Sequence, residues 1–165
     1  MKLGNVMINM GVLCSASEKG KIIVNECLKR GLTINTLKLE KLLILMHIKM
    51  LTEYRKPFFK EEVINFHHGL GIKEVDEDFR GVLRPNFNEQ IIEYICLLDA
   101  EEKVMNEVIR DYGKYDVFDL NEVWQLKKLQ RLFPDENGKG IPYQLIMAAF
   151  YDKFYDKETT NKRKK

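Results

Sequence analysis

Hydrophobic residues occupy nearly every position between Leu37 and Leu51, where only three lysines, one glutamate and one histidine interrupt them. A helix with one exposed side carries a stripe of apolar residues, so apolar residues on every side predict a helix that other elements surround. We therefore expect a central helix that starts with Thr33 or Thr36 as its N-cap and runs to about Tyr54. Its charged residues argue against a membrane span, which needs about 20 mostly uncharged residues.

Apolar residues at three- and four-residue spacing predict further amphipathic helices on both sides of the central one. Residues that commonly cap or stop helices mark their ends. The expected helices are 17–30, capped by Ser17 and stopped by Gly31; 86–113, opened by Asn86 with Glu89 and stopped by Gly113; 119–134, opened by Asp119 with Glu122 and closed by Pro134; and a last helix opened by Pro142 that carries Tyr143, Ile146, Phe150 and Phe154.

The least helical passage follows the central helix. Pro57 ends that helix, because proline disfavours helical geometry in the residue before it. Residues 62–67 partly alternate between apolar and polar types, which favours a short strand; Gly69 and Gly71 are expected to form a turn, and 72–75 a second strand. The expected fold class is mainly α: a compact single-domain helical bundle around a buried central helix, with a candidate short β-hairpin.

Length and charge indicate one domain with a basic tail. A chain of 165 residues is long enough to bury a core without metal or disulfide support. We expect a lead-in at 1–16, one helical domain at 17–156 and a tail at 157–165. The net charge is +2, but four positive charges lie in residues 162–165, so the rest of the chain carries −2. A slightly acidic body argues against nucleic-acid binding except through the tail.

Cysteine usage and the N-terminus predict a cytoplasmic protein. Cys14, Cys27 and Cys96 are odd in number and far apart, which indicates neither a disulfide framework nor a zinc ribbon. The apolar residues from Val6 to Leu13 are interrupted by Asn and Gly, so they do not form the apolar core of a signal peptide. We expect no export and no membrane insertion.

No arrangement of residues predicts catalysis, a metal or a cofactor. His67 and His68 are adjacent, so their side chains point in different directions and are poorly placed to bind one ion together. Gly69-Leu70-Gly71 lacks the third glycine of a dinucleotide-binding motif. Trp124 could stack on a base, but its helical context favours a core or partner-contact residue.

Three motifs occur in order along the central part of the chain: LKLEKLL at 37–43, KPFF at 56–59 and EEVINFHHG at 61–69. They resemble the signature of the Panacea domain, the SocA-like antitoxin family that also occurs in phage-associated proteins. A weaker similarity continues through 107–120, so that the resemblance covers about 17–133. The chain departs from the family pattern at Gly69-Leu70, where the family has Gly-Pro, at Ile44, where it has an aromatic residue, and at Phe66, where it has Trp.

The resemblance implies a mostly helical protein without enzymatic activity. Such a protein neutralises a toxin by direct binding or delivers it to a protease. An alternative on the same scaffold is a phage or mobile-element inhibitor of a bacterial defence complex, of the anti-CRISPR type. Lys41 matches a motif position and could reach a partner or an internal carboxylate, or lie with its charged end at the surface. The expected partner-binding residues are Lys41, His47, His67 and His68, and the expected fold-shaping residues are Leu39, Leu42, Phe66 and Gly69.

Overall fold

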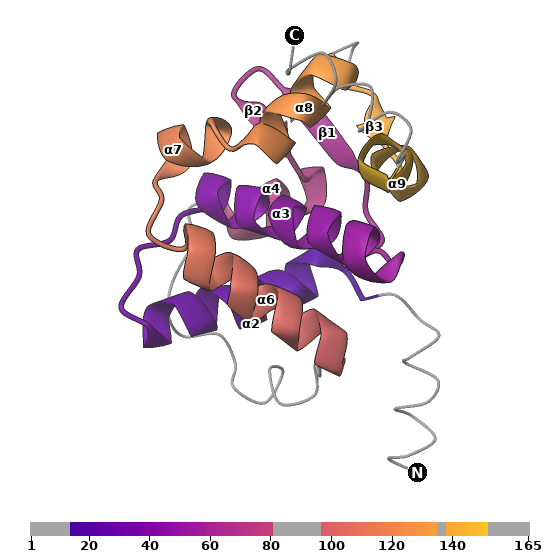
Figure 1. Cartoon of the computed structure of the whole chain (residues 1–165). Helices are drawn as coiled ribbons and strands as arrows, with labels where there is room; N and C mark the ends of the chain where they lie inside the picture. Colours follow the sequence, from indigo (N-terminus) through magenta and orange to yellow (C-terminus); the bar gives the residue numbers. More distant parts are fainter. Residues whose placement is uncertain (1–13, 81–96, 135–137, 152–165) are drawn as a thin grey trace, which may run out of the picture.

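The computed structural model describes residues 14–80, 97–134 and 138–151. Within these ranges the protein is mainly helical, with seven helices and a small antiparallel sheet. Figure 1 shows the helix α3 in the middle, with α2 and α6 on one side and α7, α8, α9 and the sheet on the other. The elements are α2 (Ala16–Lys29), α3 (Thr36–Tyr54), β1 (Val63–Phe66), β2 (Gly69–Gly71), α4 (Lys73–Phe79), α6 (Asp99–Tyr112), α7 (Val117–Asn121), α8 (Trp124–Leu132), β3 (Gly140–Ile141) and α9 (Tyr143–Tyr151).

The prediction of an enclosed central helix is confirmed. Every residue from Lys38 to Ile48 is buried, and every other described helix contacts α3. Its N-cap is Asn35, whose side chain accepts a hydrogen bond from the Lys38 amide, and neither Thr33 nor Thr36 has that role. The Thr36 hydroxyl instead donates to the Phe79 carbonyl, which ties the start of α3 to the end of α4. Capping by Asn satisfies an amide that has no partner inside the helix.

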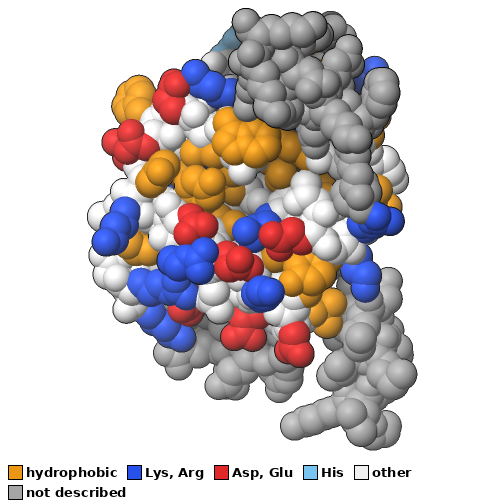
Figure 2. All heavy atoms as spheres, in the orientation of Figure 1, with side chains coloured by type: hydrophobic (Ala, Val, Ile, Leu, Met, Phe, Trp, Pro, Cys, Tyr) orange, Lys and Arg blue, Asp and Glu red, His pale blue; other side chains and the backbone are white. Residues whose placement is uncertain are grey.

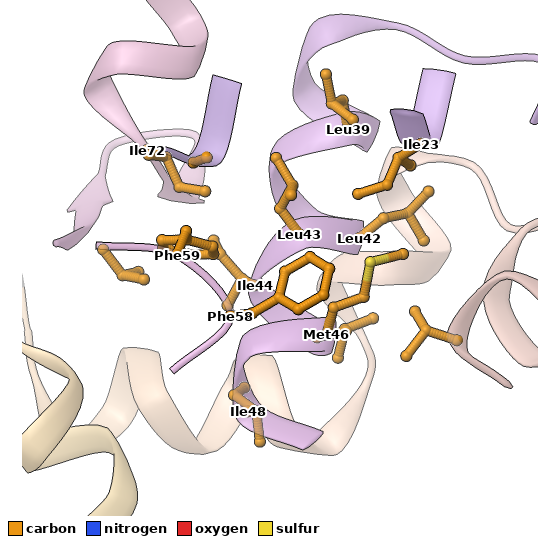
Figure 3. Close-up of a cluster of buried hydrophobic side chains, with 14 of the residues drawn as sticks. Ile23, Leu39, Leu42, Leu43, Ile44, Met46, Ile48, Phe58, Phe59 and Ile72 are labelled. Carbon is orange, nitrogen blue, oxygen red and sulfur yellow. The ribbon is translucent and has the colours of Figure 1, made fainter. Parts of the chain in front are cut away.

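The core lies around α3 and includes two phenylalanines from the segment that follows it. Figure 3 shows Phe58 and Phe59 beside the apolar side chains of α3. Both phenylalanines are completely buried. The Lys19 ammonium of α2 donates to the Phe58 carbonyl and pairs with Glu101 of α6, so this segment, α2 and α6 are linked through one buried cation. Burying a Phe or Leu side chain contributes about 1.5–3 kcal/mol, so each side chain of this cluster stabilises the fold by about that amount.

The helix α2 begins two residues earlier than predicted. Ser15 is the N-cap, and its hydroxyl accepts from the Glu18 amide while the Glu18 side chain reaches back to Ser15. This is a capping box, which satisfies two amides at once. Ser17, the predicted cap, lies inside α2, and its hydroxyl donates a hydrogen bond to the Asp78 carboxylate of α4.

The strand at 62–67 is present, but the predicted hairpin is wrong in detail. β1 pairs with β2, with Phe66 opposite Gly69 and Ile64 opposite Gly71, so His67 and His68 form the turn. Gly69 and Gly71 lie in the second strand and not in the turn. Of the residues predicted as the second strand, 72–75, Ile72 is the N-cap of α4 and 73–75 form its first turn. β3 pairs with the other edge of β1, giving the order β2-β1-β3.

The two later helices are shorter than predicted. Leu98 has extended backbone angles, so α6 starts at Asp99 and a single helix from 86 to 113 is ruled out; the cap predicted at Asn86 lies outside the described residues. The helix predicted at 119–134 is split into α7 and α8 by the extended backbone of Val123. Asp116 caps α7 by accepting from the Asp119 amide, so Asp119 lies inside the first turn.

The last helix begins at Tyr143, one residue after Pro142, whose carbonyl accepts from the Leu145 and Ile146 amides. Phe154 of the predicted apolar stripe lies outside the described residues, as do the tail at 157–165 and most of the lead-in. None of the helices in the described ranges combines the length and apolar character needed to cross a membrane.

Candidate functional site

Two adjacent charged residues of α3 hold the outer edge of the hairpin. The Lys41 ammonium donates to the Leu70 carbonyl at 3.0 Å, and the Glu40 carboxylate accepts from the Ile72 amide at 2.8 Å. Both side chains are completely buried. An edge strand leaves a row of backbone groups without partners. Glu40 and Lys41 therefore supply to β2 the acceptor and the donor that another strand would supply.

The glycines of β2 make room for these two side chains. A Cβ on Gly71 would lie 2.7 Å from the Glu40 carboxylate oxygen and 2.9 Å from the Phe66 ring. Gly69 has a positive φ of 109°, and a Cβ there would lie 3.2 Å from the Lys41 ammonium. Gly69-Leu70-Gly71 is thus a place where side chains approach the backbone closely.

Burial changes the protonation of this pair. It raises the pKa of Glu40 from 4.5 to about 7, although the hydrogen bond from the Ile72 amide acts in the opposite direction. Burial also lowers the pKa of Lys41, while the nearby Glu40 carboxylate raises it. The second carboxylate oxygen of Glu40 has no hydrogen-bond partner. A charged Glu40 is therefore costly, because an unsatisfied charged oxygen lies away from water.

His47 also lies in the interior. Its Nδ1 accepts from the Phe58 amide at 3.0 Å, and its ring stacks on Phe59 with centroids 4.0 Å apart. Burial, assisted by the positive charge of Lys19, lowers the pKa of His47 to about 3, so the ring is neutral. Neither His47 nor Lys41 has surface that a partner could contact in this structure. Their prediction as partner-binding residues is corrected to an interior role.

His67 and His68 are exposed at the tip of the β1–β2 hairpin. The His68 ring stacks on Phe66, with centroids 5.3 Å apart. In the parts of the chain that the structure describes, no three His, Cys, Asp or Glu side chains are grouped as metal ligands would be. The fold-shaping candidates Leu39 and Leu42 are completely buried in the core, and Phe66 and Gly69 form the pair that closes the hairpin.

A groove opens on the surface where four helices meet. It has a volume of about 300 Å³. Figure 2 shows hydrophobic side chains gathered near α8, next to the charged side chains that cover α6. The lining residues are Leu45, Ile48, Lys49, Thr52 and Glu53 of α3, Val108, Asp111 and Tyr112 of α6, Trp124 and Gln125 of α8, and Phe150 of α9.

Trp124 reaches this groove because of the way that α8 is buried. Val123, Leu126 and Leu129 follow one another at three-residue spacing and face the core, which leaves Trp124 on the outer side. Its side chain is 58% exposed, and its ring contacts Phe150 edge-on with centroids 5.9 Å apart. Tryptophan is enriched at protein interfaces, where part of the side chain is buried and its polar N–H stays accessible.

Carboxylates outnumber cations among the lining residues of the groove, which include Glu53, Asp111 and Lys49. The Lys49 ammonium lies between two carboxylates, 3.4 Å from Glu53 and 3.6 Å from Glu107, which lies outside the lining. The groove thus offers apolar surface, one exposed indole and carboxylates, which suit binding.

Comparison with models of protein families, with curated proteins and with solved structures finds no match for this chain. The candidate site is accordingly defined by its own geometry. The sequence favours Trp124 as a core or partner-contact residue and does not single out Gln125 or Asp111. The buried face of α8 at 123, 126 and 129 decides that Trp124 points outward, and Asp111 reaches the groove from α6.

Proposed function

We propose that this protein binds another protein through the groove around Trp124 and thereby neutralises it, as an antitoxin does with a toxin or effector. The observation that carries this proposal is the exposed indole at the edge of a groove that is also lined by carboxylates. Tryptophan is among the residues that contribute most to protein–protein binding, especially next to a pocket that excludes water. The motifs at 37–69, which resemble the Panacea domain, support an antitoxin type of action.

The arrangement of the remaining candidates agrees with binding by the outer surface. Glu40, Lys41 and His47 each use a polar atom to hold backbone groups inside the protein. The proposed setting is the cytoplasm, since Cys14 and Cys27 are free thiols, as is usual in a reducing compartment. Inhibition would follow from covering a surface that the partner needs for its own activity.

Co-expression with the product of the neighbouring gene tests this function. We expect that product to stop growth by itself, and the wild-type chain to restore growth. Trp124→Ala should fail to restore it, because losing such an anchor weakens binding by about 2 kcal/mol, or roughly 30-fold. Phe118→Ala is the matched control: Phe118 is 82% exposed and does not line the groove, so this variant should protect.

If the product of the neighbouring gene does not stop growth by itself, the antitoxin proposal is wrong. If Trp124→Ala restores growth as fully as the wild type, the groove is not the binding site. The resemblance extends to phage-associated proteins, so the target could instead be a bacterial defence complex. Phage plaque formation on defended hosts that express the chain separates the two targets. Restored plaques would favour the defence complex, and unchanged plaque counts would exclude it.

A further inference from the structure

The groove carries more negative than positive charge at its lining. Glu53 and Asp111 are carboxylates, and Lys49 is the one cation among the lining residues. That cation already lies between Glu53 and Glu107. The Arg110 guanidinium beside Asp111 holds the pKa of that carboxyl below its usual range, so Asp111 is charged at neutral pH. An occupant with positive charge is therefore favoured over a phosphate or an acidic peptide.

In the part of the chain that the structure describes, Arg110 and Lys128 do not cancel this excess of negative charge. Arg110 pairs with Asp111 at 2.9 Å, but both side chains are well exposed, and such surface pairs exchange readily for another cation. Lys128 lies over the Phe150 ring at 4.9 Å and is buried, and it is not one of the lining residues. The open mouth of the groove is thus bounded by Asp111 and Glu53.

The carboxylates at the groove favour an occupant that donates hydrogen bonds. Among side chains, an arginine guanidinium has the most N–H donors, five, in a fixed plane, and has no acceptor to oppose Glu53 or Asp111.

The exposed indole of Trp124 favours an arginine side chain over a lysine side chain as the occupant of the groove. A guanidinium is flat and stacks on an indole face, whereas a lysine ammonium is a compact and strongly hydrated charge. Trp124 offers such a face because its side chain is 58% exposed. A volume of about 300 Å³ holds one large side chain and little more.

From these features we propose, building on the proposed function, that the groove receives an arginine side chain from a segment of the partner protein. The guanidinium lies against the exposed face of Trp124 and pairs with the Asp111 carboxylate, both of which are open to solvent. The apolar residues next to that arginine in the partner lie along the rim of the groove at Trp124. The partner class is thus a protein with an exposed arginine flanked by apolar residues.

Tryptophan fluorescence tests this directly, because Trp124 is the only tryptophan of the chain. The probes are three acetylated and amidated pentapeptides of alanine and leucine whose central residue is arginine, lysine or citrulline. Citrulline keeps the planar shape but lacks the charge. We expect the arginine peptide to change the emission saturably, with an affinity at least tenfold higher than the citrulline peptide and severalfold higher than the lysine peptide.

Variants of the chain locate the binding. Asp111→Asn should weaken binding of the arginine peptide by fivefold or more and should leave binding of the citrulline peptide unchanged. Gln144→Leu, at an exposed position of α9 outside the groove, is the matched control and should bind as the wild type does. Circular dichroism of each variant checks that it is folded, and Asp111 is exposed, so its replacement leaves the core untouched.

Equal affinity for the arginine and citrulline peptides would overturn the proposal, as would unchanged binding of the arginine peptide by Asp111→Asn. A change in emission that depends on protein concentration alone would also overturn it and would assign the groove to a second copy of the chain. Failure of the arginine proposal can be told apart from failure of the proposed function. If Trp124→Ala no longer restores growth but the chain binds the arginine and citrulline peptides equally, the proposed function stands and the arginine assignment is wrong.

Discussion

Replacing Glu40 by glutamine should change how the stability of the protein depends on pH. Glu40 is completely buried, and burial raises its pKa from an ordinary 4.5 to about 7. Because the folded state holds this proton more tightly than the unfolded state, the stability from this group is complete below pH 4.5. It is lost as the pH rises through 7.

The size of the effect follows from the two pKa values. Each unit corresponds to about 1.4 kcal/mol, so ionising Glu40 in the folded protein costs roughly 3 kcal/mol in the free energy of unfolding. Glutamine keeps an oxygen that can accept from the Ile72 amide and cannot ionise. Relative to the wild type, Glu40→Gln should therefore gain roughly 3 kcal/mol between pH 4 and pH 8.5.

Urea denaturation followed by circular dichroism at several pH values measures this difference. Subtracting the wild type removes the titration of all groups that the two proteins share. Glu74→Gln makes the same chemical change on an exposed side chain of α4 and is the matched control. A difference between Glu40→Gln and the wild type that is constant with pH, or that favours the variant at acid pH, would refute the reasoning.

Three further changes probe the interior. Gly71→Ala should lower the free energy of unfolding by about 1–3 kcal/mol, since its Cβ would lie 2.7 Å from the Glu40 carboxylate; urea denaturation that shows no loss would mean that the hairpin edge adjusts freely. Leu42→Ala should cost about 2–5 kcal/mol by leaving a cavity beside α3, whereas the exposed Phe118→Ala should change the thermal midpoint little. His47→Asn should reduce the loss of stability as the pH falls from 6.5 towards 3, by up to roughly 4–5 kcal/mol, because the folded protein keeps His47 neutral; acid titrations that match the wild type would contradict this.

The central helix could be predicted from the sequence because its signal is local. Apolar residues on every side of 37–51 require burial all round, and α3 is enclosed in that way. The partners of its charged residues could not be predicted in the same manner. Lys41 and Glu40 hold backbone groups of Leu70 and Ile72, about thirty residues later, and no spacing in the sequence connects them.

The errors in the hairpin have the same origin. Gly69 and Gly71 were predicted as a turn, since glycine is common in turns. In the structure the turn is His67-His68, and the glycines are required by side chains that approach from α3. The long helices were predicted as continuous because their periodicity is continuous. The extended backbone of Leu98 sets the start of α6, and that of Val123 separates α7 from α8, in both cases without a proline or a glycine.

The surface groove is formed where four helices pack together. It could not be predicted from the sequence, because no local pattern shows how these helices are arranged. Trp124 was weighed from the sequence, and its exposure is set by the buried face of α8. Gln125 and Asp111 carry no motif. They become candidates only because the groove brings them to one place.

The most direct measurement of the central claim is the affinity of the purified chain for its purified partner, determined by isothermal titration calorimetry with Trp124→Ala and with Phe118→Ala. The account predicts binding that is weaker by roughly 30-fold for Trp124→Ala and unchanged for Phe118→Ala. Equal affinity of Trp124→Ala and the wild type would contradict it.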